Sequence, residues 1–547
     1  MSHARLLSIE VTRFKSYLAP TRLDLKPLTV LVGRNNSGKS TMVQALLLLK
    51  QTLENPRTDV PLNLVGTVEA LSLRELTHGW PETLDDENPG PTFALEFESQ
   101  LDLAQALAST VKTSEKVLID NGVPGLSYGK SHAVVKTRVE LCFGSEGRRT
   151  HLTKVRIVSQ GPHKRRSLAQ FLAAPPQIYA SDFAVLLVRG RDGGFHLAID
   201  SDDVEGFGVE WDHFIPHLTF DRSGSGPRDA NRIRHNLWLF RCRQPLEDLR
   251  ALLRGFGFLG STRSLPPTLY RVSASEPPET VGVSGEYAAE ILHARRNDVV
   301  HYLRPVRIED NVPTLETTVQ ARPLVEAVND VFAAMGLVGQ ISIEDVQEIG
   351  FRLLFGKATL QHVGRGLTYL LPLVEYGLLL DPKRFEGSET VGRDAFLASL
   401  TSYSLAALEE PEAHIHPKLQ TQLAHWFVAL AMGGRNLIVE THSDHFVRRL
   451  RGLIARAPQG SLLETWLRDN VSIVEVSQDS AGNSTLSASA LTEQGDFERW
   501  PADFMDVATD EEREIYDAAL DKSTAAPPGP TTASAIVHDE GEEPEEG

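Results

Sequence analysis

The sequence predicts an α/β fold with a mixed central sheet, an antiparallel β lobe and helical insertions. Three observations predict it. Near the N-terminus, an apolar strand runs into a glycine-rich loop and an apolar helix over residues 28–50. Two further apolar strands with polar ends flank a helix over residues 405–445. Between these segments, runs of alternating apolar and polar residues are typical of half-buried strands.

The first elements are a strand, a loop and a helix. An alternating segment over residues 4–17 is expected to form a strand that leads into the apolar strand 28–32. The loop that follows fits G-x-x-x-x-G-K-S, and its backbone N–H groups would converge on a phosphate. A glycine-rich turn with an exposed lysine is the alternative, which the flanking strand and helix disfavour. The residues expected to bind phosphate are Gly33, Arg34, Asn35, Asn36, Ser37, Gly38, Lys39, Ser40 and Thr41.

Within that loop, two side chains have separate expected tasks. Lys39 would reach the β- and γ-phosphates of a nucleotide, and the Ser40 hydroxyl would bind Mg²⁺. Asn35 and Asn36 tolerate left-handed backbone geometry, which suits a tightly wrapped loop.

The middle of the chain is expected to be rich in strands. Residues 92–100 and 136–143, and three further runs before residue 200, alternate as half-buried strands, which predicts an antiparallel lobe between about 90 and 220. A helix is expected at 244–255 and an amphipathic helix at 319–336. The Pro- and Gly-rich stretch 259–291 is expected to be a loop that becomes helical at its end.

Two strand ends near the C-terminus carry polar side chains. Strand 405–408 ends in Glu409 and Glu410, and Pro417 is expected to open the next helix. Glu409 could hold Mg²⁺ directly or through water, and Glu410 could orient or deprotonate the water that attacks a γ-phosphate. An acidic loop after a strand is the alternative.

A second strand, 436–440, is followed by His442, which could donate a hydrogen bond to the γ-phosphate. A purely structural histidine is the alternative. The spacing predicts two neighbouring parallel strands joined by the helix 417–432, with their polar ends at one edge of the sheet. Upstream, Gly364 and Gly366 precede an apolar helix, whose N-terminal N–H groups could bind a second phosphate face; a simple glycine turn is the alternative.

Composition limits the class of protein. The 547 residues have a net charge of −18 and only two cysteines, Cys142 and Cys242, which disfavours a disulfide scaffold and suits a reducing cytoplasm. No secretion signal and no uncharged apolar run of membrane-spanning length is seen, so a membrane partner is not expected. Basic clusters at 147–156, 163–167 and 447–457 could contact DNA or be solvated faces.

In this order, the loop 33–41, the acidic strand end 405–417 and the segment 440–446 resemble the ABC-type ATPases, and within them the OLD-like and SMC-like branch. The resemblance implies a P-loop NTPase fold of the ABC-head type. It also implies that ATP and Mg²⁺ are bound, with Glu409 in the Walker B position, Glu410 as the catalytic residue and His442 as the switch. Segment 362–372 resembles the signature region of that branch, although Val363 stands where a serine is usual.

The resemblance implies a homodimer in which two heads pair head-to-tail around ATP. Relatives that stand alone imply an ATP-driven switch that gates a separate nuclease or toxin effector or acts on DNA, in anti-phage defence or DNA repair. The alternative is a scaffold that binds ATP without hydrolysing it. A membrane transporter's ATPase subunit is disfavoured.

The expected organisation follows from these assignments. The N-terminal half of the head would span 1–100, an insertion 101–255, and the C-terminal half 256–475. A C-terminal segment would follow at 476–522, and a disordered acidic tail at 523–547.

Overall fold

The computed structural model describes residues 4–85, 87–102, 132–160, 182–220, 238–271, 278–347, 349–380, 404–489, 491–499 and 513–517. The chain divides into one unit over Met1–Pro501 and a second over Ala502–Gly547. In the second unit the structure describes a helical turn at 513–517. The predicted disordered tail, 523–547, lies outside the described residues.

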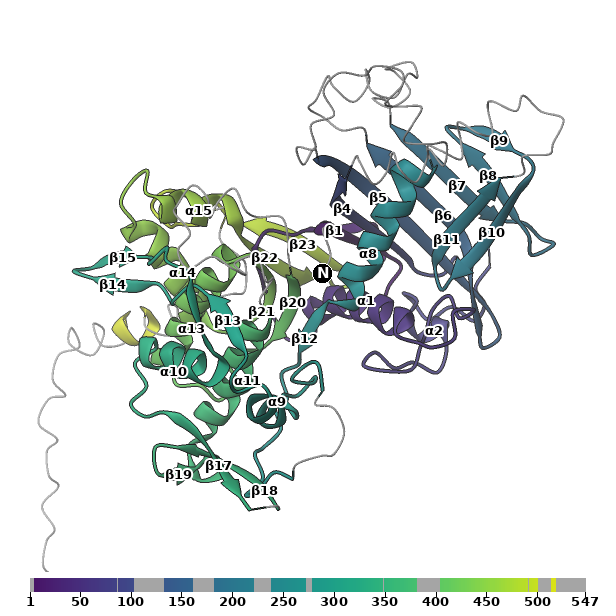
Figure 1. Cartoon of the computed structure of the whole chain (residues 1–547). Coiled ribbons are helices and arrows are strands. Elements are labelled where there is room, and N and C mark those ends of the chain that lie inside the picture. The colour runs from purple at the N-terminus through teal and green to yellow at the C-terminus, as the bar shows by residue number, and fades with distance from the viewer. Residues whose placement is uncertain are drawn as a thin grey trace, which may run out of the picture. The chain divides into compact units, whose positions relative to one another are not determined.

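A mixed central sheet carries the glycine-rich loop and the acidic strand ends (Figure 1). The strand order is β12 (Gly257–Leu259), β20 (Ser404–Glu409), β21 (Arg435–Glu440), β3 (Leu28–Val32), β22 (Val471–Gln478) and β23 (Ser484–Ser489). The first five strands are parallel, and β23 is antiparallel to β22. All residues of β3 and β21 are buried, as expected for strands covered on both faces.

The predicted strand–helix–strand unit is present in this sheet. Helix α13 (Pro417–Met432) begins at the predicted proline and joins β20 to its parallel neighbour β21. Strand β3 lies on the other side of β21, so the carboxyl ends of all three strands meet at one edge. Helix α1 (Lys39–Leu53) starts directly after β3 and the loop.

An eight-stranded antiparallel sheet forms the predicted β lobe. Its order is β2 (Thr21–Asp24), β1 (Ala4–Thr12), β4 (Thr92–Asp102), β5 (His132–Glu146), β6 (Arg149–Gln160), β7 (Phe183–Arg189), β8 (Phe195–Ile199) and β9 (Asp202–Val204). All the alternating runs predicted between 92 and 200 lie in it. The sheet also contains β1 and β2, so its strands come from both sides of the boundary predicted at residue 100. The positions of the predicted domain boundaries stay predictions.

Helix α8 (Gln244–Arg254) connects the lobe to the central sheet. It lies on one face of the antiparallel sheet and contacts β1, β4 and α1 (Figure 1). Lys50 of α1 donates hydrogen bonds to the carbonyls of Arg254 and Phe256 at 3.1 and 2.7 Å, and Arg254 donates to the carbonyl of Leu53 at 2.7 Å. Because each helix donates to the other's end, α1 and α8 are held together, and their apolar residues share one core.

The other elements are short. Four small sheets contain β10 (Phe207–Asp212) and β11 (Ile215–Phe220); β13 (Val299–Tyr302) and β16 (Gln320–Pro323); β14 (Arg307–Glu309) and β15 (Val312–Thr314); and β17 (Ile341–Val346), β18 (Gly350–Phe355) and β19 (Ala358–Thr359). The remaining helices are α2 (Leu73–Leu76), η1 (Leu239–Arg243), α9 (Ala288–Ala294), α10 (Leu324–Ala334), η2 (Leu360–His362), α11 (Arg365–Leu379), α14 (Asp444–Arg456) and α15 (Leu462–Asn470).

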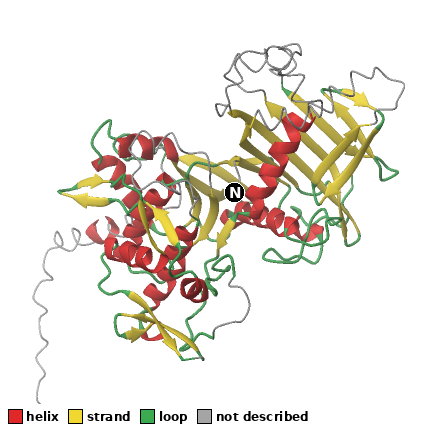
Figure 2. Cartoon of the chain, viewed as in Figure 1, coloured by secondary structure: helices red, strands yellow, loops and turns green. Residues whose placement is uncertain are grey.

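The predicted fold class is confirmed: the chain has an α/β P-loop fold with a mixed central sheet and a large antiparallel sheet. Figure 2 shows most helices around the central sheet and few on the antiparallel one. Two helix boundaries differ from the prediction. Residues 320–323 pair as a strand, so the helix predicted from 319 begins at Leu324. Gly366 lies in the first turn of α11, not before it. Across the described residues, no helix has the length and apolar character needed to span a membrane.

Candidate active site

The glycine-rich loop has the wrapped geometry that its sequence predicts. Gly33 and Gly38 have φ values of 142° and 101°, and Asn36 is left-handed with φ 64°. A Cβ on Gly33 would lie 2.2 Å from the carbonyl oxygen of Val476, so only glycine fits there. Ser484 donates to the carbonyl of Ser37 at 2.6 Å, which fixes the loop from β23.

Lys39 lies at the first position of α1 and is buried. Its Nζ donates to the carbonyls of Gly33 and Arg34 at 3.0 and 2.8 Å, so the amine curls back over its own loop. Burial lowers the pKa of Lys39, and the carboxylates of Glu440, Glu410 and Glu412 oppose that shift. The lysine and the acidic strand ends are therefore within electrostatic range of one another.

The ends of β20 and β21 bring their glutamates side by side. Glu409 and Glu440 are register partners of the parallel pair. Glu410 follows with φ 41°, and its N–H donates to the carbonyl of Glu440 at 2.8 Å. A left-handed backbone is unfavourable for a residue with a side chain, and such residues concentrate at functional sites.

Glu440 is the site residue that the sequence reasoning missed. Its Oε1 accepts a hydrogen bond from the Ser40 hydroxyl at 2.9 Å, and its Oε2 is buried without a partner among the described residues. Burial and the nearby Glu409 raise the pKa of Glu440 to about 7. The sequence pattern could have identified Glu440 as a site residue, because Glu440 ends the second buried strand just as Glu409 ends the first. Ser40 contacts Glu440 and not Glu409, which was predicted to share the metal with it.

His442 and Glu412 complete the acidic edge. The N–H of His442 donates to Oε1 of Glu412 at 2.7 Å, and its Nε2 lies 4.0 Å from Oε1 of Glu410. Burial and the charge of Lys39 lower the pKa of His442, although Glu410 opposes them, so the imidazole is neutral at pH 7. Burial raises the pKa of Glu412. The predicted residues Glu410 and His442 thus lie together.

A buried arginine comes to this edge from a loop with no recognisable motif. Arg263 is 5% exposed, and its Nη2 donates to the carbonyl of Glu409 at 3.3 Å. Its Nη1 is buried without a hydrogen-bond partner in the part of the chain described. Burial lowers the pKa of Arg263 to about 10, against the opposing effect of Glu409, Tyr369, Glu410 and Glu412. The arginine therefore offsets part of the negative charge at the strand ends.

A cavity of about 620 Å³ opens beside the loop, which is within the usual size range of ligand pockets. Lys39, Ser40 and Glu440 line it, together with Lys15 and Trp80 from segments that the sequence did not mark. Trp80 is 70% exposed, so its indole face is accessible. The cavity can hold a phosphate-bearing ligand at the loop and a planar group against Trp80.

The signature-like glycines lie elsewhere. Gly364 caps α11, and a Cβ on it would meet nothing within 4 Å. Gly366 packs close to the carbonyl of His414. No residue of α11 is among the described residues that line the cavity beside the loop. The predicted second phosphate contact at Gly364 and Gly366 stays a prediction.

The oxygen atoms around Ser40 fit Mg²⁺ held at a phosphate. The described residues contain no group of three or more His, Cys, Asp and Glu side chains arranged to hold a metal. Mg²⁺ at phosphates needs only one or two carboxylates, because water and phosphate oxygens fill the other positions. The Ser40 hydroxyl and the unpartnered Oε2 of Glu440 are oxygens of this kind. The donor set therefore fits a phosphate-bound cation.

Some members of two predicted basic clusters pair with nearby acids. Residues 163–167 lie outside the described residues. Within 147–156, Lys154 pairs with Glu140 at 3.1 Å. Within 447–457, Arg448 pairs with Asp444 at 3.3 Å, and Arg451 pairs with Asp496 at 2.6 Å.

Two family comparisons coincide with the two halves of this site. The family described as an AAA ATPase domain matches residues 5–117, which include the glycine-rich loop. The family described as an AAA domain, putative AbiEii toxin, Type IV TA system matches residues 394–448, which include β20, β21 and His442. Both matches are to AAA-type ATPase domain families, and each covers less than half of the chain. None of the curated proteins matches the chain.

Three solved structures resemble the chain at 11% identity. The Smc head bound to the C-winged helix domain of ScpA has a TM-score of 0.35 and covers 89% of this chain and 98% of its own. The SMC head domain from Thermotoga maritima has a TM-score of 0.31, with 88% and 98% covered. The Smc head with an extended coiled coil, bound to the C-terminal domain of ScpA derived from Pyrococcus furiosus, has a TM-score of 0.33, with 94% and 100% covered. The fold assignment rests on strand order and the loop, not on these scores.

Proposed function

We propose that the protein is an Mg²⁺-dependent ATPase that works as a nucleotide-controlled switch. The observation that carries the proposal is the convergence of Lys39 and Ser40 with the glutamates at the ends of β20 and β21. A phosphate loop facing acidic strand ends is what hydrolysis of a phosphoanhydride needs, because one side holds the phosphates and the other activates water.

Each residue of the site has its own task in the proposed reaction. The loop N–H groups bind the β- and γ-phosphates, and the Lys39 amine leaves the carbonyls of Gly33 and Arg34 to pair with them. Glu410 is 43% exposed at its side chain and accepts a proton from the attacking water. His442, neutral at pH 7, donates a hydrogen bond to a γ-phosphate oxygen.

The cation would be held by Ser40 and by Glu440, with Glu409 beside them. When bound, Mg²⁺ supplies positive charge that offsets the charge developing on the phosphates. Glu440 must be ionised to take part, and nearby positive charge favours that form.

A homodimer fits the position of the signature-like helix. Gly364 at the start of α11 is open and does not line the nucleotide cavity of its own chain. In a head-to-tail pair, this helix N-terminus would face the γ-phosphate of the partner subunit, where its N–H groups favour negative charge. Val363 lacks the hydroxyl of a signature serine, so we expect slow turnover.

The switch would gate a separate effector, such as a nuclease or toxin, or act on DNA in the cytoplasm. The match to a family whose description names a putative toxin of a type IV TA system supports a link to a toxin. A role in anti-phage defence rests on the resemblance to stand-alone ATPases. DNA repair by an OLD-like protein is the neighbouring possibility. A non-hydrolysing scaffold would leave the geometry of Glu410 and His442 without a use.

Phosphate release from ATP tests the proposal directly. We expect the purified protein to hydrolyse ATP with Mg²⁺, and Lys39→Ala to lose turnover and nucleotide binding at the phosphate loop. Lys154→Ala, in the antiparallel sheet, is the control and should behave as wild type. Turnover that persists in Lys39→Ala would contradict the proposal, and tight ATP binding without any hydrolysis would favour the scaffold. Adding duplex DNA to the same assay shows whether DNA stimulates the reaction.

A further inference from the structure

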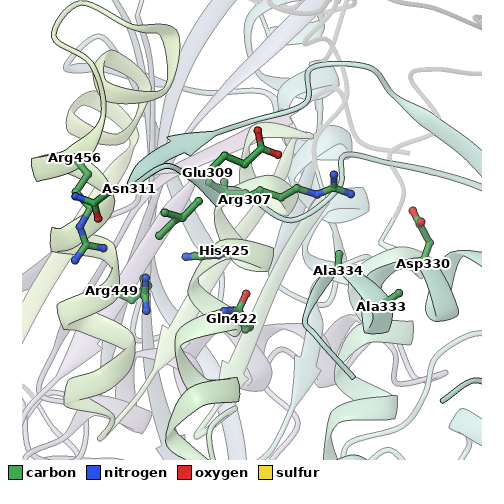
Figure 3. A pocket seen from close by; sticks show the side chains of 12 residues that line it. Arg307, Glu309, Asn311, Asp330, Ala333, Ala334, Gln422, His425, Arg449 and Arg456 are labelled. Atoms are coloured by element: carbon green, nitrogen blue, oxygen red, sulfur yellow. The ribbon is translucent and has the colours of Figure 1, made fainter. Parts of the chain in front are cut away.

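A second cavity, of about 650 Å³, is lined by residues of α13, α14 and the β14–β15 hairpin (Figure 3). Helix α13 contributes Gln422 and His425, helix α14 contributes Arg449 and Arg456, and the β14–β15 hairpin contributes Arg307. Figure 3 shows His425 in the middle, with Arg449 and Arg456 on one side and Arg307 on the other. The ATPase proposal uses none of these residues.

Two of the arginines of α14 line this cavity, and the other two do not. Arg449 and Arg456 are two helical turns apart and share the cavity face, whereas Arg448 and Arg451 pair with acids elsewhere. Among the described residues, no ion pair involves Arg307, Arg449 or Arg456. Burial and the charge of Arg456 lower the pKa of Arg449, which shows that the two cations repel each other. An anion between them would relieve that repulsion.

His425 is an independent sign of a ligand. It is 3% exposed, and neither ring nitrogen makes a hydrogen bond of good geometry within the described part of the chain, although the backbone of Val306 lies close enough to raise its pKa. A buried polar group without a partner costs about 1–3 kcal/mol, so such groups are rare unless something binds them. Burial, with the charges of Arg449 and Arg456, lowers the pKa of His425 to about 4. At pH 7 the neutral ring offers one donor and one acceptor.

Two carboxylates also line the cavity, and they do not cancel its positive charge. Asp330 is held by Arg304 at 2.8 Å and by Tyr302 at 2.7 Å. Glu309 lies on the hairpin and is exposed. Three arginines therefore face one carboxylate that is not already paired.

We infer that this cavity binds a small phosphorylated ligand, such as a nucleotide or inorganic phosphate, with Arg449, Arg456 and Arg307 on the phosphate and His425 donating to it. Arginine suits this task because its planar fork matches phosphate oxygens. The volume is that of a ligand pocket. A duplex backbone does not fit the geometry, because the central donor, His425, is buried and duplex phosphates stay on the surface of the duplex.

The position of the cavity connects it to the ATPase site. Helix α13 begins seven residues after Glu410, and α14 begins two residues after His442. The helices are also joined at that end, where Ser443 donates to Oε1 of Gln420 at 2.7 Å. A ligand that draws Arg449 towards His425 acts on the two helices that follow the catalytic side chains.

Binding of inorganic pyrophosphate and of ADP to Lys39→Ala tests the inference, because the phosphate loop is disabled in that background. Isothermal titration calorimetry should give saturable binding of at least one probe. Adding Arg449→Ala or Arg456→Ala should weaken it about tenfold or more, the loss expected for one charge-assisted hydrogen bond. Arg448→Ala, on the same helix but outside the cavity, is the matched control and should not change affinity.

Each outcome supports or overturns the inference. Tighter binding of ADP than of pyrophosphate identifies a nucleotide site, and equal binding identifies a site for inorganic phosphates; both support the inference. No saturable binding of either probe overturns it, as does binding that is the same in all three arginine variants. Binding of a short DNA duplex that depends on Arg449 and Arg456, without binding of either small probe, also overturns it. Because the phosphate loop is disabled throughout, these results do not depend on whether the protein hydrolyses ATP.

Discussion

The two large sheets of the molecule use buried charge in opposite ways. In the central sheet, Glu409 and Glu440 lie side by side at strand ends, and burial raises the pKa of both. In the antiparallel sheet, Glu96 lies within a strand and pairs with Arg22 at 2.7 Å and with Lys136. Burial opposes ionisation of Glu96, but these two partners lower its pKa overall.

The difference follows from how the strands are covered. The antiparallel strands alternate between buried and partly exposed residues, so acids and bases pair across neighbouring strands on the open face. Strands β3 and β21 of the central sheet are buried along their whole length, and the neighbouring strands β20 and β21 each end in a glutamate. In the antiparallel sheet, these acids pair with bases of the same sheet. In the central sheet, the glutamates at the strand ends remain available to bind a cation.

The largest expected effect is on ATP turnover, which should depend on an acid of the central sheet and not on one of the antiparallel sheet. Glu410→Gln removes the proton acceptor, so ATP turnover should fall by about 10²–10⁴-fold while nucleotide still binds. The variant should also accumulate as a dimer with ATP, which size-exclusion chromatography with light scattering measures. Glu140→Gln, in the antiparallel sheet, is the control and should hydrolyse ATP at the wild-type rate. A Glu410→Gln protein with wild-type turnover would show that another residue activates the water.

The next effect is on the pH dependence of the free energy of unfolding, which should differ between acids of the two sheets. Glu440 has a folded pKa of about 7 against 4.5 unfolded, so the folded state holds its proton more tightly, and the free energy of unfolding falls as pH rises from 4.5 to 7. Glu440→Gln resembles the protonated form. It should differ from wild type by less than about 1 kcal/mol at pH 5 and, without nucleotide, be more stable at pH 8 by up to about 3 kcal/mol. Urea denaturation at the two pH values measures this.

Glu96→Gln should behave in the opposite way. The folded pKa of Glu96 is lowered, so its stabilisation is present above pH 4.5 and is lost as pH falls through the folded pKa. The variant should be less stable than wild type at both pH 5 and pH 8. If both variants change stability with the same pH dependence, the contrast between the sheets is wrong.

The smallest effect concerns the cavity beside the loop. Trp80 is expected to stack on the base of a bound nucleotide, and base–aromatic stacking contributes about 1–3 kcal/mol per base. Trp80→Ala should therefore weaken ADP binding by about tenfold, at the lower part of that range because the ring is exposed. Calorimetry measures the affinity, and Trp80→Phe should restore most of it. Unchanged binding in Trp80→Ala would place the base elsewhere in the cavity.

Much of this arrangement could be predicted from the sequence because it is local. The loop 33–41 carries its own pattern, alternation marks the antiparallel strands, and two apolar runs with a helix between them predict β20, α13 and β21. Glu440 was within reach by the same reasoning, since it ends a buried strand. Arg263 and Trp80 were not, because they lie in loops without periodicity and reach the site through contacts distant in the chain. The site roles themselves stay predictions until they are measured.

The hydrogen bonds from Lys50 of α1 to the carbonyl of Arg254, and from Arg254 of α8 to the carbonyl of Leu53, have a mechanical consequence. Helix α1 starts at the phosphate loop, and α8 lies on a sheet whose eight strands, about 4.8 Å apart, span about 34 Å. A tilt of α1 by about 5° would move the far edge of that sheet by about 3 Å, on the same spacing. In the proposed switch, the hydrogen bonds between α1 and α8 would carry such a tilt from the phosphate loop to the outer strands of the lobe.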